Sequence, residues 1–190
     1  MTKTDSGVEV GRLNDRVDVL ELRETKDAAG KAWAWETIRR TWAKAELMTK
    51  ANVYSVHGLG AAGVTFTLRR QPLGLDNALR WRGQHCLITA IQPLGRLYWT
   101  VDAALVVLSQ CEDRYTDIRF PAIMTEKYLA HQQLEPMAVN ILRHVLVTPK
   151  CIQLTPGKLV EVDGVSWPIR VPHLLDPHKN EYELERTVDL

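Results

Sequence analysis

Three small groups of residues have the types and spacing of chemical sites. The first is Gly58-Leu59-Gly60-Ala61-Ala62-Gly63, which matches the G-x-G-x-x-G pattern and is followed by Asp76 at 18 residues from Gly58. A dinucleotide site requires a buried strand before the glycines and a helix after them, because the helix N-terminus meets the pyrophosphate. Here a segment of strand periodicity follows and no buried strand precedes, so the pattern favours a flexible loop.

The other two groups lie near the C-terminus. Ser166, His173 and Asp176 have the residue types of a hydrolase triad, but Ser166 has no nucleophile elbow around it and precedes Trp167-Pro168 in a predicted strand. His173 and His178 lack the i, i+4 spacing of a helical metal pair, and the nearby prolines disfavour that helix. We therefore predict no enzyme: no catalytic residue, no metal site and no cofactor.

Tryptophan is frequent in the first half of the chain, where exposed rings could stack on nucleic-acid bases. Their alternation along predicted strands instead places at least three of them in a core or at a subunit contact. Both interpretations stay open on the sequence alone. The tryptophans concerned are Trp33, Trp35, Trp42, Trp81 and Trp99.

Positive charge is concentrated locally, although the net charge is only +1. Residues 1–110 hold 15 Lys and Arg against 11 Asp and Glu, whereas residues 111–190 hold 9 against 12. This balance disfavours a protein that coats nucleic acid in bulk, but it is compatible with a local contact to a polyanion. One stretch has only Glu46 against six basic residues: Arg39, Arg40, Lys44, Lys50, Arg69 and Arg70.

The remaining composition is that of an ordinary globular chain, with 45% hydrophobic and 25% charged residues. No apolar run approaches the roughly 18 residues of a membrane span, and the first residues lack the apolar core of a signal peptide. We expect synthesis in the cytoplasm and no membrane partner. Cys86, Cys111 and Cys151 are odd in number and too far apart for a zinc knuckle, so we expect reduced, buried thiols.

Strand periodicity dominates the chain and predicts a mainly β fold built as a small barrel or sandwich. Ala78–Leu108 is typical of a hairpin followed by a long strand, and Met48–Gly63 is predicted to be a long exposed loop. Further strands are predicted at 16–24, 33–38, 41–47, 64–68, 143–148, 151–154 and 159–162. Two short helices are predicted, one at Pro121–Gln133 and one beginning at Pro136.

The sequence pattern of this hairpin recurs, less clearly, near the C-terminus. Aligning the glycines sets Trp81-Arg82-Gly83 beside Val162-Asp163-Gly164 and Ile88 beside Ile169, which indicates one module used twice. Because Ser109–Asp117 is short and polar, we predict a β-barrel domain at 1–110 and a smaller β-rich domain at 111–190, with the helices at the junction. The second domain is either a diverged repeat of the first or a docking domain.

Over Gly11–Leu108 the order of these elements resembles the head–tail joining (adaptor or head-closure) family of tailed bacteriophages. The resemblance rests on pattern and order: an opening Leu-x-x-Arg-Val strand, an Asp-x-x-Gly turn, two tryptophan strands, a long loop, a strand ending in Arg and a basic-Gly hairpin. The matching segments are Leu13-Asn14-Asp15-Arg16-Val17-Asp18-Val19, Asp27-Ala28-Ala29-Gly30, Trp33–Trp35, Trp42-Ala43-Lys44-Ala45-Glu46, Thr65–Arg69 and Arg82-Gly83-Gln84-His85-Cys86-Leu87-Ile88.

The resemblance implies a virion protein of the phage neck that forms a ring of about six or about twelve copies. Such a ring would stand between the portal or adaptor protein and the tail terminator or tail tube protein. It would close the channel on packaged double-stranded DNA, which it would contact without sequence specificity. The loop Leu47–Gly63 would project into the channel, and the residues implied to lie near DNA are Lys50, Asn52, Tyr54, His57, Gly58, Gly60, Gly63, Arg69 and Arg70.

Two other functions fit the same residues. One is a single-stranded nucleic-acid-binding module of OB-like form, in which the tryptophans stack on bases. The other is a different ring component of the same particle, such as a tail terminator.

Overall fold

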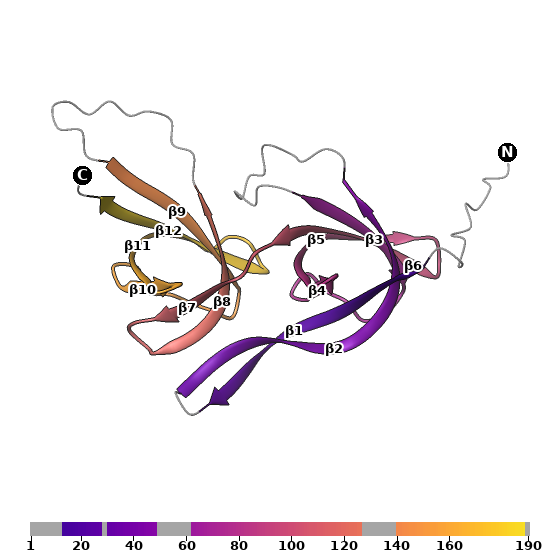
Figure 1. Ribbon diagram of the computed structural model, residues 1–190, viewed down its shortest axis with the longest axis horizontal. Helices are drawn as coiled ribbons and strands as arrows, with labels where there is room; N and C mark the ends of the chain where they lie inside the picture. The colour runs from indigo at the N-terminus through magenta and orange to yellow at the C-terminus, as the bar shows by residue number, and fades with distance from the viewer. Residues whose placement is uncertain (1–12, 28–29, 49–61, 127–139, 189–190) are drawn as a thin grey trace. The chain divides into compact units, whose positions relative to one another are not determined.

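The computed structural model describes residues 13–27, 30–48, 62–126 and 140–188 (Figure 1). Within these ranges the backbone forms twelve strands and no helix, which confirms the predicted mainly β class. Among the same residues, no helix has the length and apolarity to cross a membrane. The strands are β1 (Asp15–Asp27), β2 (Gly30–Leu47), β3 (Gly63–Arg69), β4 (Ala78–Trp81), β5 (Gln84–Leu94), β6 (Tyr98–Val106), β7 (Ser109–Asp113), β8 (Ile118–Glu126), β9 (Asn140–Pro149), β10 (Leu159–Val162), β11 (Val165–His173) and β12 (Lys179–Val188).

The helix predicted at Pro121–Gln133 is wrong for its first half, because residues 118–126 form β8. Residues 120–123 are all buried and β8 pairs with both β7 and β9, so burial of both strand faces and the ladder bonds outweigh the helical spacing of the later apolar residues. Residues 127–139 lie outside the described part of the chain. The helix expected from Pro136 cannot continue to Ile141, since β9 already begins at Asn140.

The chain divides into two compact units. Of the described residues, unit 1 contains 13–22, 35–48 and 62–107, and unit 2 contains 23–27, 30–34, 108–126 and 140–188. Strands β1 and β2 therefore contribute to both units. The segment expected to be a polar boundary begins with a strand, because Ser109–Asp113 is β7.

Strand pairing closes on itself in each unit, with the same order. In unit 1 the order is β1, β4, β5, β6, β3 and β2, and β2 pairs with β1 again. In unit 2 the order is β7, β10, β11, β12, β9 and β8, and β8 pairs with β7 again. Counted from the first strand of each unit, both rings follow 1-4-5-6-3-2.

The two rings also share two local features, a hairpin turn with positive φ and a register shift. Their β4–β5 and β10–β11 hairpins turn through Arg82-Gly83 and Asp163-Gly164, with positive φ at all four residues (51°, 81°, 48° and 84°). These angles are those of a type I′ turn, whose twist matches the twist of the flanking strands. Each hairpin is followed at equal distance by a register shift, between Ile88 and Ala90 in β5 and between Ile169 and Val171 in β11.

Alternation explains how each ring fills its interior. In β3 the side chains of Val64, Phe66 and Leu68 are completely buried. Phe66 meets Trp81 edge to face with ring centroids 5.9 Å apart, which is a favoured aromatic geometry. The core of unit 1 is completed by Val17, Val19, Ala43, Leu79, Cys86, Ile88, Val101 and Ala103.

In unit 2 a polar network joins the core to the segment after β9. Tyr182 is fully buried, and its hydroxyl oxygen accepts a hydrogen bond from the Leu154 amide at 3.0 Å. Asn180 donates from Nδ2 to the carbonyl of Ile152 at 2.8 Å. The buried apolar residues of unit 2 include Cys111, Phe120, Ala122, Leu146, Val147, Val160, Val162, Trp167, Ile169 and Leu184.

The three cysteines are all free thiols, but only two are buried. Burial raises the pKa of Cys86 to about 11 and that of Cys111 to about 12, so both stay protonated near neutral pH. Cys151 is exposed, and the expectation of a buried thiol is wrong at this position.

His85 on β5 is a partly buried titratable side chain. Its ring lies 5.1 Å from the Trp35 ring, centroid to centroid, and its Nε2 atom is buried without a hydrogen-bond partner among the described residues. Burial, reinforced by the nearby charge of Arg80, lowers the pKa of His85 to about 4.

We predict that acid destabilises the folded chain through His85. Below pH 6.5 the unfolded chain protonates this ring, whereas the folded chain does not until about pH 4, so stability falls as pH falls through that window. The loss reaches about 3 kcal/mol by pH 4 and then levels off for this group. Urea unfolding at several pH values measures it. His85→Phe should flatten the slope, with the exposed His173→Gln as the matched control, and an unchanged slope in His85→Phe contradicts the prediction.

Candidate functional site

The residues predicted to lie near DNA fall into two places. Lys50, Asn52, Tyr54, His57, Gly58 and Gly60 lie outside the described residues. Gly63 begins β3, whereas Arg69 ends it and Arg70 follows. Seven extended residues span about 20 Å, so the structure places Gly63 and the arginines at opposite ends of one strand. Arg69 and Arg70 therefore do not form the base of the connection between β2 and β3.

Glycine is needed at position 63 because the Met48 side chain packs close to its backbone, and not because its backbone angle is unusual. The Met48 amide donates to the Gly63 carbonyl at 2.9 Å. A Cβ atom at position 63 would lie 2.6 Å from the Met48 sulfur, so any larger residue must displace that side chain. This contact fixes where β2 ends and β3 begins.

Arg70 is anchored to the sheet by an aromatic ring. Its guanidinium carbon lies 4.4 Å from the centroid of Trp99, a cation–π distance. Trp99 in turn donates from Nε1 to the Gln71 carbonyl at 3.2 Å. Arg70 thus stabilises the end of β3 and is less available to a ligand than Arg69.

A hollow lies on the outer face of unit 1 beside Arg69. We call it the tryptophan hollow; it has a volume of about 700 Å³ and is lined by Leu13, Asn14, Arg40, Thr41, Trp42 and Arg69. Ala43 points into the core, so alternation turns its neighbour Trp42 outward, where 57% of its surface is exposed. An exposed indole in a hollow that two arginines also line can stack on a flat ligand or anchor a protein contact.

Next to this hollow lies a second feature, the arginine cluster. It surrounds a depression of about 280 Å³ and consists of Arg16, Asp18, Arg40, Arg80 and Arg82 with Gly83. Asp18 holds two of its guanidinium groups, with Arg40 Nε at 3.2 Å and Arg80 Nη2 at 3.0 Å. The cluster keeps an excess of positive charge because its four arginines meet only two carboxylates, Asp18 within it and Asp15 beside Arg82.

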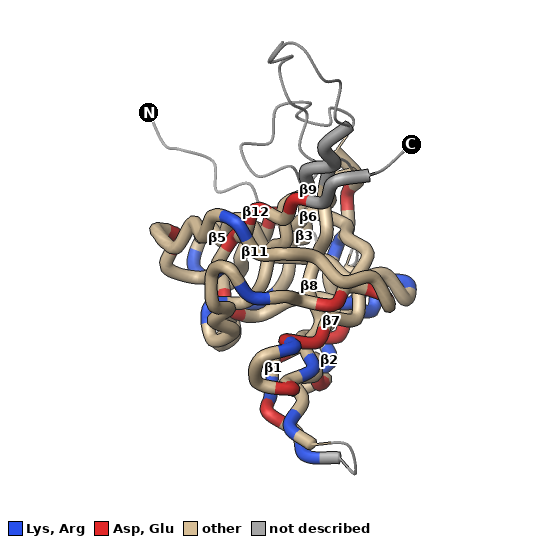
Figure 2. The backbone as a smooth tube through the Cα atoms, turned by 90° about the vertical axis from the view of Figure 1, so that its left-hand side faces the viewer, with Lys and Arg blue, Asp and Glu red and all other residues tan. Residues whose placement is uncertain are grey.

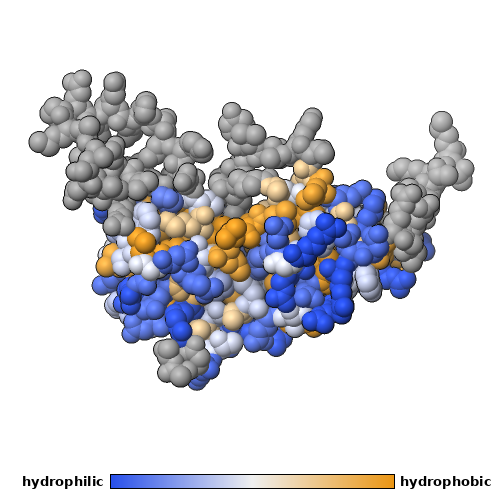
Figure 3. Space-filling model, viewed as in Figure 1, coloured by the Kyte–Doolittle hydropathy of each residue, from blue (hydrophilic) through white to orange (hydrophobic). Residues whose placement is uncertain are grey.

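Residues beside the arginine cluster hold the side chains of Arg82 and Arg80 in place. Asp15 Oδ1 accepts hydrogen bonds from Trp81 Nε1 at 3.0 Å and from Arg82 Nη2 at 3.4 Å, while the Arg82 guanidinium lies over the Trp81 ring. Arg80 also donates to the Thr37 hydroxyl at 2.7 Å. Figure 3 shows a strongly hydrophilic patch on the half of the molecule where Figure 1 places β1, β2 and β4. Guanidinium groups held in this way match phosphate or carboxylate groups.

The residues that resemble a hydrolase triad have separate structural roles. Ser166 and His173 lie near opposite ends of β11, about 20 Å apart along an extended strand. His173 Nε2 contacts Glu183 Oε1 at 3.0 Å, and Asp176 accepts from the amides of His178 and Lys179. Within the described part of the chain, no group of three or more His, Cys, Asp or Glu residues is placed to hold a metal ion.

Sequence reasoning found Arg40 and Arg69 but missed Arg16, Arg80 and Arg82. The missing information is the strand register: Asp18 pairs with Arg80 across β1 and β4, 62 residues apart in the chain. The spacing of Arg80 and Arg82 at i and i+2 beside a turn glycine is the one local signal that could have flagged the cluster.

Comparison with known proteins gave no match to a family model, a curated protein or a solved structure.

We predict that Asp18 limits the affinity of the arginine cluster for anions. Asp18→Asn removes the central negative charge but keeps a hydrogen-bonding side chain, so binding of a polyanion such as heparin should strengthen several-fold at low salt. The effect should shrink as salt is added. Fluorescence anisotropy with labelled heparin measures it. Glu46→Gln, which removes an exposed charge elsewhere on β2, is the control; equal gains in both variants would place binding outside the cluster.

Proposed function

We propose that this chain is a structural protein of a tailed-phage particle that forms a ring at the portal–tail junction. The ring closes the DNA channel after packaging and offers the surface to which the tail attaches. The observation that supports this most is the arginine cluster beside the tryptophan hollow, on the outer face of one small closed sheet. Arginines that contact phosphates give affinity for DNA without reading its sequence, as a channel wall requires.

The strand pairing favours a rigid spacer. Each unit is proposed to be a small barrel, since its pairing closes and leaves no strand of the ring without two neighbours. One copy then contributes two barrels, which would contact the portal or adaptor protein and the tail terminator or tube protein. The connection between β2 and β3 remains the proposed channel segment, and Arg69 would meet the duplex at a different level, because β3 separates the two.

We predict that the purified chain binds duplex DNA of unrelated sequences with equal affinity. Arg69→Ala should weaken binding several-fold and lower the slope of log affinity against log salt by about 1, since one phosphate contact is lost. Arg96→Ala, in the exposed turn between β5 and β6, removes the same charge and should change neither. Anisotropy titrations at several salt concentrations measure both quantities.

The purified chain also serves to test whether copies of it assemble into the proposed ring. Negative-stain microscopy and native mass spectrometry of the concentrated chain, alone and on linear duplex DNA, should show closed rings of one stoichiometry. A chain that stays monomeric under all these conditions, or that loses as much affinity in Arg96→Ala as in Arg69→Ala, contradicts the proposal.

One observation favours a second candidate, a single-stranded nucleic-acid-binding module. Trp42 is 57% exposed and lines the hollow together with Arg40 and Arg69, so a base could stack on the indole while neighbouring phosphates meet the arginines.

Substitution of Trp42 distinguishes the single-stranded nucleic-acid-binding module from the ring protein that contacts duplex DNA. If the hollow stacks bases, Trp42→Ala should weaken binding of a short oligothymidylate by about tenfold, in line with 1–3 kcal/mol per stacked base, and Trp42→Phe should restore most of it. If the hollow faces duplex DNA, both variants should bind a duplex about as well as the parent chain. Competition between the labelled oligonucleotide and an unlabelled duplex decides which form is preferred.

A further inference from the structure

The tryptophan hollow and the arginine cluster are two parts of one continuous surface on unit 1. Arg40 lines both of them, so the two depressions adjoin at its side chain. The strands that carry them are neighbours in the order β4, β1, β2 and β3. Adjacent strands lie about 4.8 Å apart, so Trp42 on β2 is one strand spacing from the arginine on β1. One ligand of nucleotide size can therefore reach both depressions.

Strand alternation turns the polar and aromatic side chains of this surface outward. Val17 on β1 is completely buried, so its neighbours Arg16 and Asp18 lie on the outer face. On β2 the same alternation places Arg40 and Trp42 on that face, two residues apart. The outer face thus sets an exposed indole beside guanidinium groups from two adjacent strands.

Part of the hydrogen-bonding capacity of these arginines is not used within the described part of the chain. Asp18 meets Arg40 through Nε, at 3.2 Å, and the two Nη atoms of that guanidinium carry four further N–H donors. None of the described residues forms an ion pair or hydrogen bond with the guanidinium of Arg16, which is exposed. Planar guanidinium groups match the oxygen atoms of a phosphate with paired hydrogen bonds. These donors favour an anionic ligand.

The charge of the arginine cluster favours a dianion. Its four arginines meet two carboxylates, Asp18 and Asp15, which leaves two positive charges. A terminal phosphate carries a charge of about −1.5 to −2 at pH 7, whereas a phosphate within a nucleic-acid strand carries a single negative charge. A terminal phosphate therefore neutralises the cluster more completely than a phosphate inside a strand.

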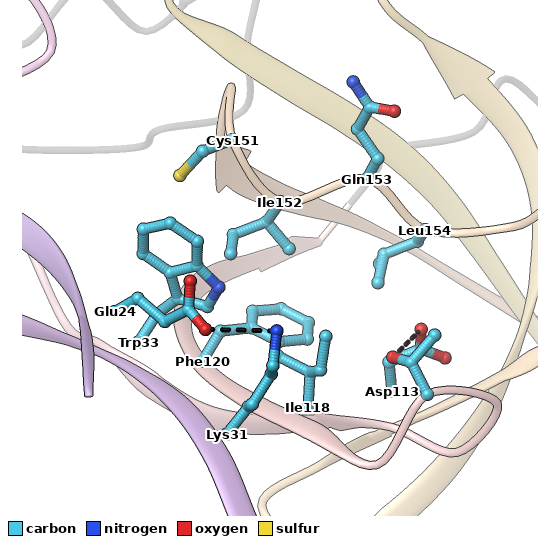
Figure 4. A pocket seen from close by; sticks show the side chains of 11 residues that line it. Glu24, Lys31, Trp33, Asp113, Ile118, Phe120, Cys151, Ile152, Gln153 and Leu154 are labelled. Carbon is cyan, nitrogen blue, oxygen red and sulfur yellow. Dashed lines mark hydrogen bonds and ion pairs between the residues drawn. The ribbon is translucent and has the colours of Figure 1, made fainter. Parts of the chain in front are cut away.

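The hollow of unit 2, shown in Figure 4, lacks this combination although it also contains an indole. Trp33 lines it together with two acidic residues and one basic residue, Glu24, Asp113 and Lys31. Lys31 Nζ contacts Glu24 Oε1 at 3.3 Å, and Asp113 accepts from the Thr116 hydroxyl at 2.7 Å. Figure 2 shows basic and acidic residues interspersed along β1 and β2, which contribute to this hollow and to the arginine cluster. The excess of positive charge belongs to the surface on unit 1.

We propose that unit 1 binds a nucleotide with a terminal phosphate, its base stacked on Trp42 and its phosphate in the arginine cluster. Arg40 lies where the two parts of the ligand join, and Arg16 donates to the phosphate. The ligand is a free nucleoside monophosphate or the phosphorylated end of a DNA strand, which share this chemistry. The inference deepens the proposed contact with DNA and rests on it only for the second source. The site needs no ring, because its residues belong to one unit of one copy.

Calorimetry with thymidine monophosphate tests the site. The parent chain should bind it about tenfold more tightly than its phosphate methyl ester, which keeps the base but has one charge fewer. Arg16→Gln should abolish this preference, and Trp42→Ala should weaken binding of both ligands about tenfold. Arg96→Gln, in an exposed turn outside the site, is the matched control and should change neither. Absence of binding, equal affinity for the two ligands, no effect of Trp42→Ala, or equal effects of the two arginine variants overturns the inference.

A labelled oligothymidylate, with or without a phosphate at its unlabelled end, distinguishes the two sources by fluorescence anisotropy. About tenfold tighter binding of the phosphorylated form, lost in Arg16→Gln, assigns the site to the end of a DNA strand. No such preference, together with the expected calorimetry, assigns it to a free nucleoside monophosphate. Rings that bind duplex DNA without preference for a terminal phosphate in either assay would leave the proposed function standing and refute this site. A terminal-phosphate preference in a chain that forms no ring would do the reverse.

Discussion

Closure of the backbone pairing is the constraint on which both units depend. A ring of six strands closes more easily where a bulge bends a strand, and β5 and β11 each have a register shift at the same distance from their turns. In β5 the extra residue is Thr89, whose hydroxyl donates to the Asp102 carbonyl at 3.1 Å and so compensates for the interrupted ladder. Strand closure then fixes every register in the ring, and with it the partners of each outward side chain.

Equal registers make the two units comparable position by position. Asp18 pairs with Arg80 in unit 1, and the corresponding pair in unit 2 is Glu112 with Glu161. Arg114 bonds both glutamates, so two carboxylates meet one guanidinium here in unit 2, whereas arginines outnumber carboxylates at the corresponding place in unit 1. The interiors stay apolar in both rings while the outer faces differ in sign. One fold thus provides two surfaces of different chemistry, which is the expected outcome when packing constrains the inside and partners constrain the outside.

The sequence predicts which side chains point into the core better than it predicts which residues become neighbours on adjacent strands. Alternation of Val64, Phe66 and Leu68 predicts their burial, and Asp163-Gly164 predicts its turn, because both signals are local. The helix expected over Pro121–Gln133 fails because apolar residues three and four apart also occur in a strand buried between two others. The arginine cluster stays invisible for a different reason: Arg16, Arg40 and Arg80 meet only through pairings between strands that are distant in the chain.

Strand β2 shows how pairing decides the role of like residues. Near its start, Ala32 pairs with Arg119 of β8, and Trp33 is partly covered and lines a hollow of about 250 Å³ in unit 2. Further along, where Ala43 faces the core and pairs with β3, the neighbouring Trp42 is left largely uncovered. Composition alone treats both indoles as potential stacking platforms. Only the strand register places Trp33 in a hollow of unit 2 and Trp42 in a hollow of unit 1 that Arg40 and Arg69 also line, so two indoles of one strand have different surroundings.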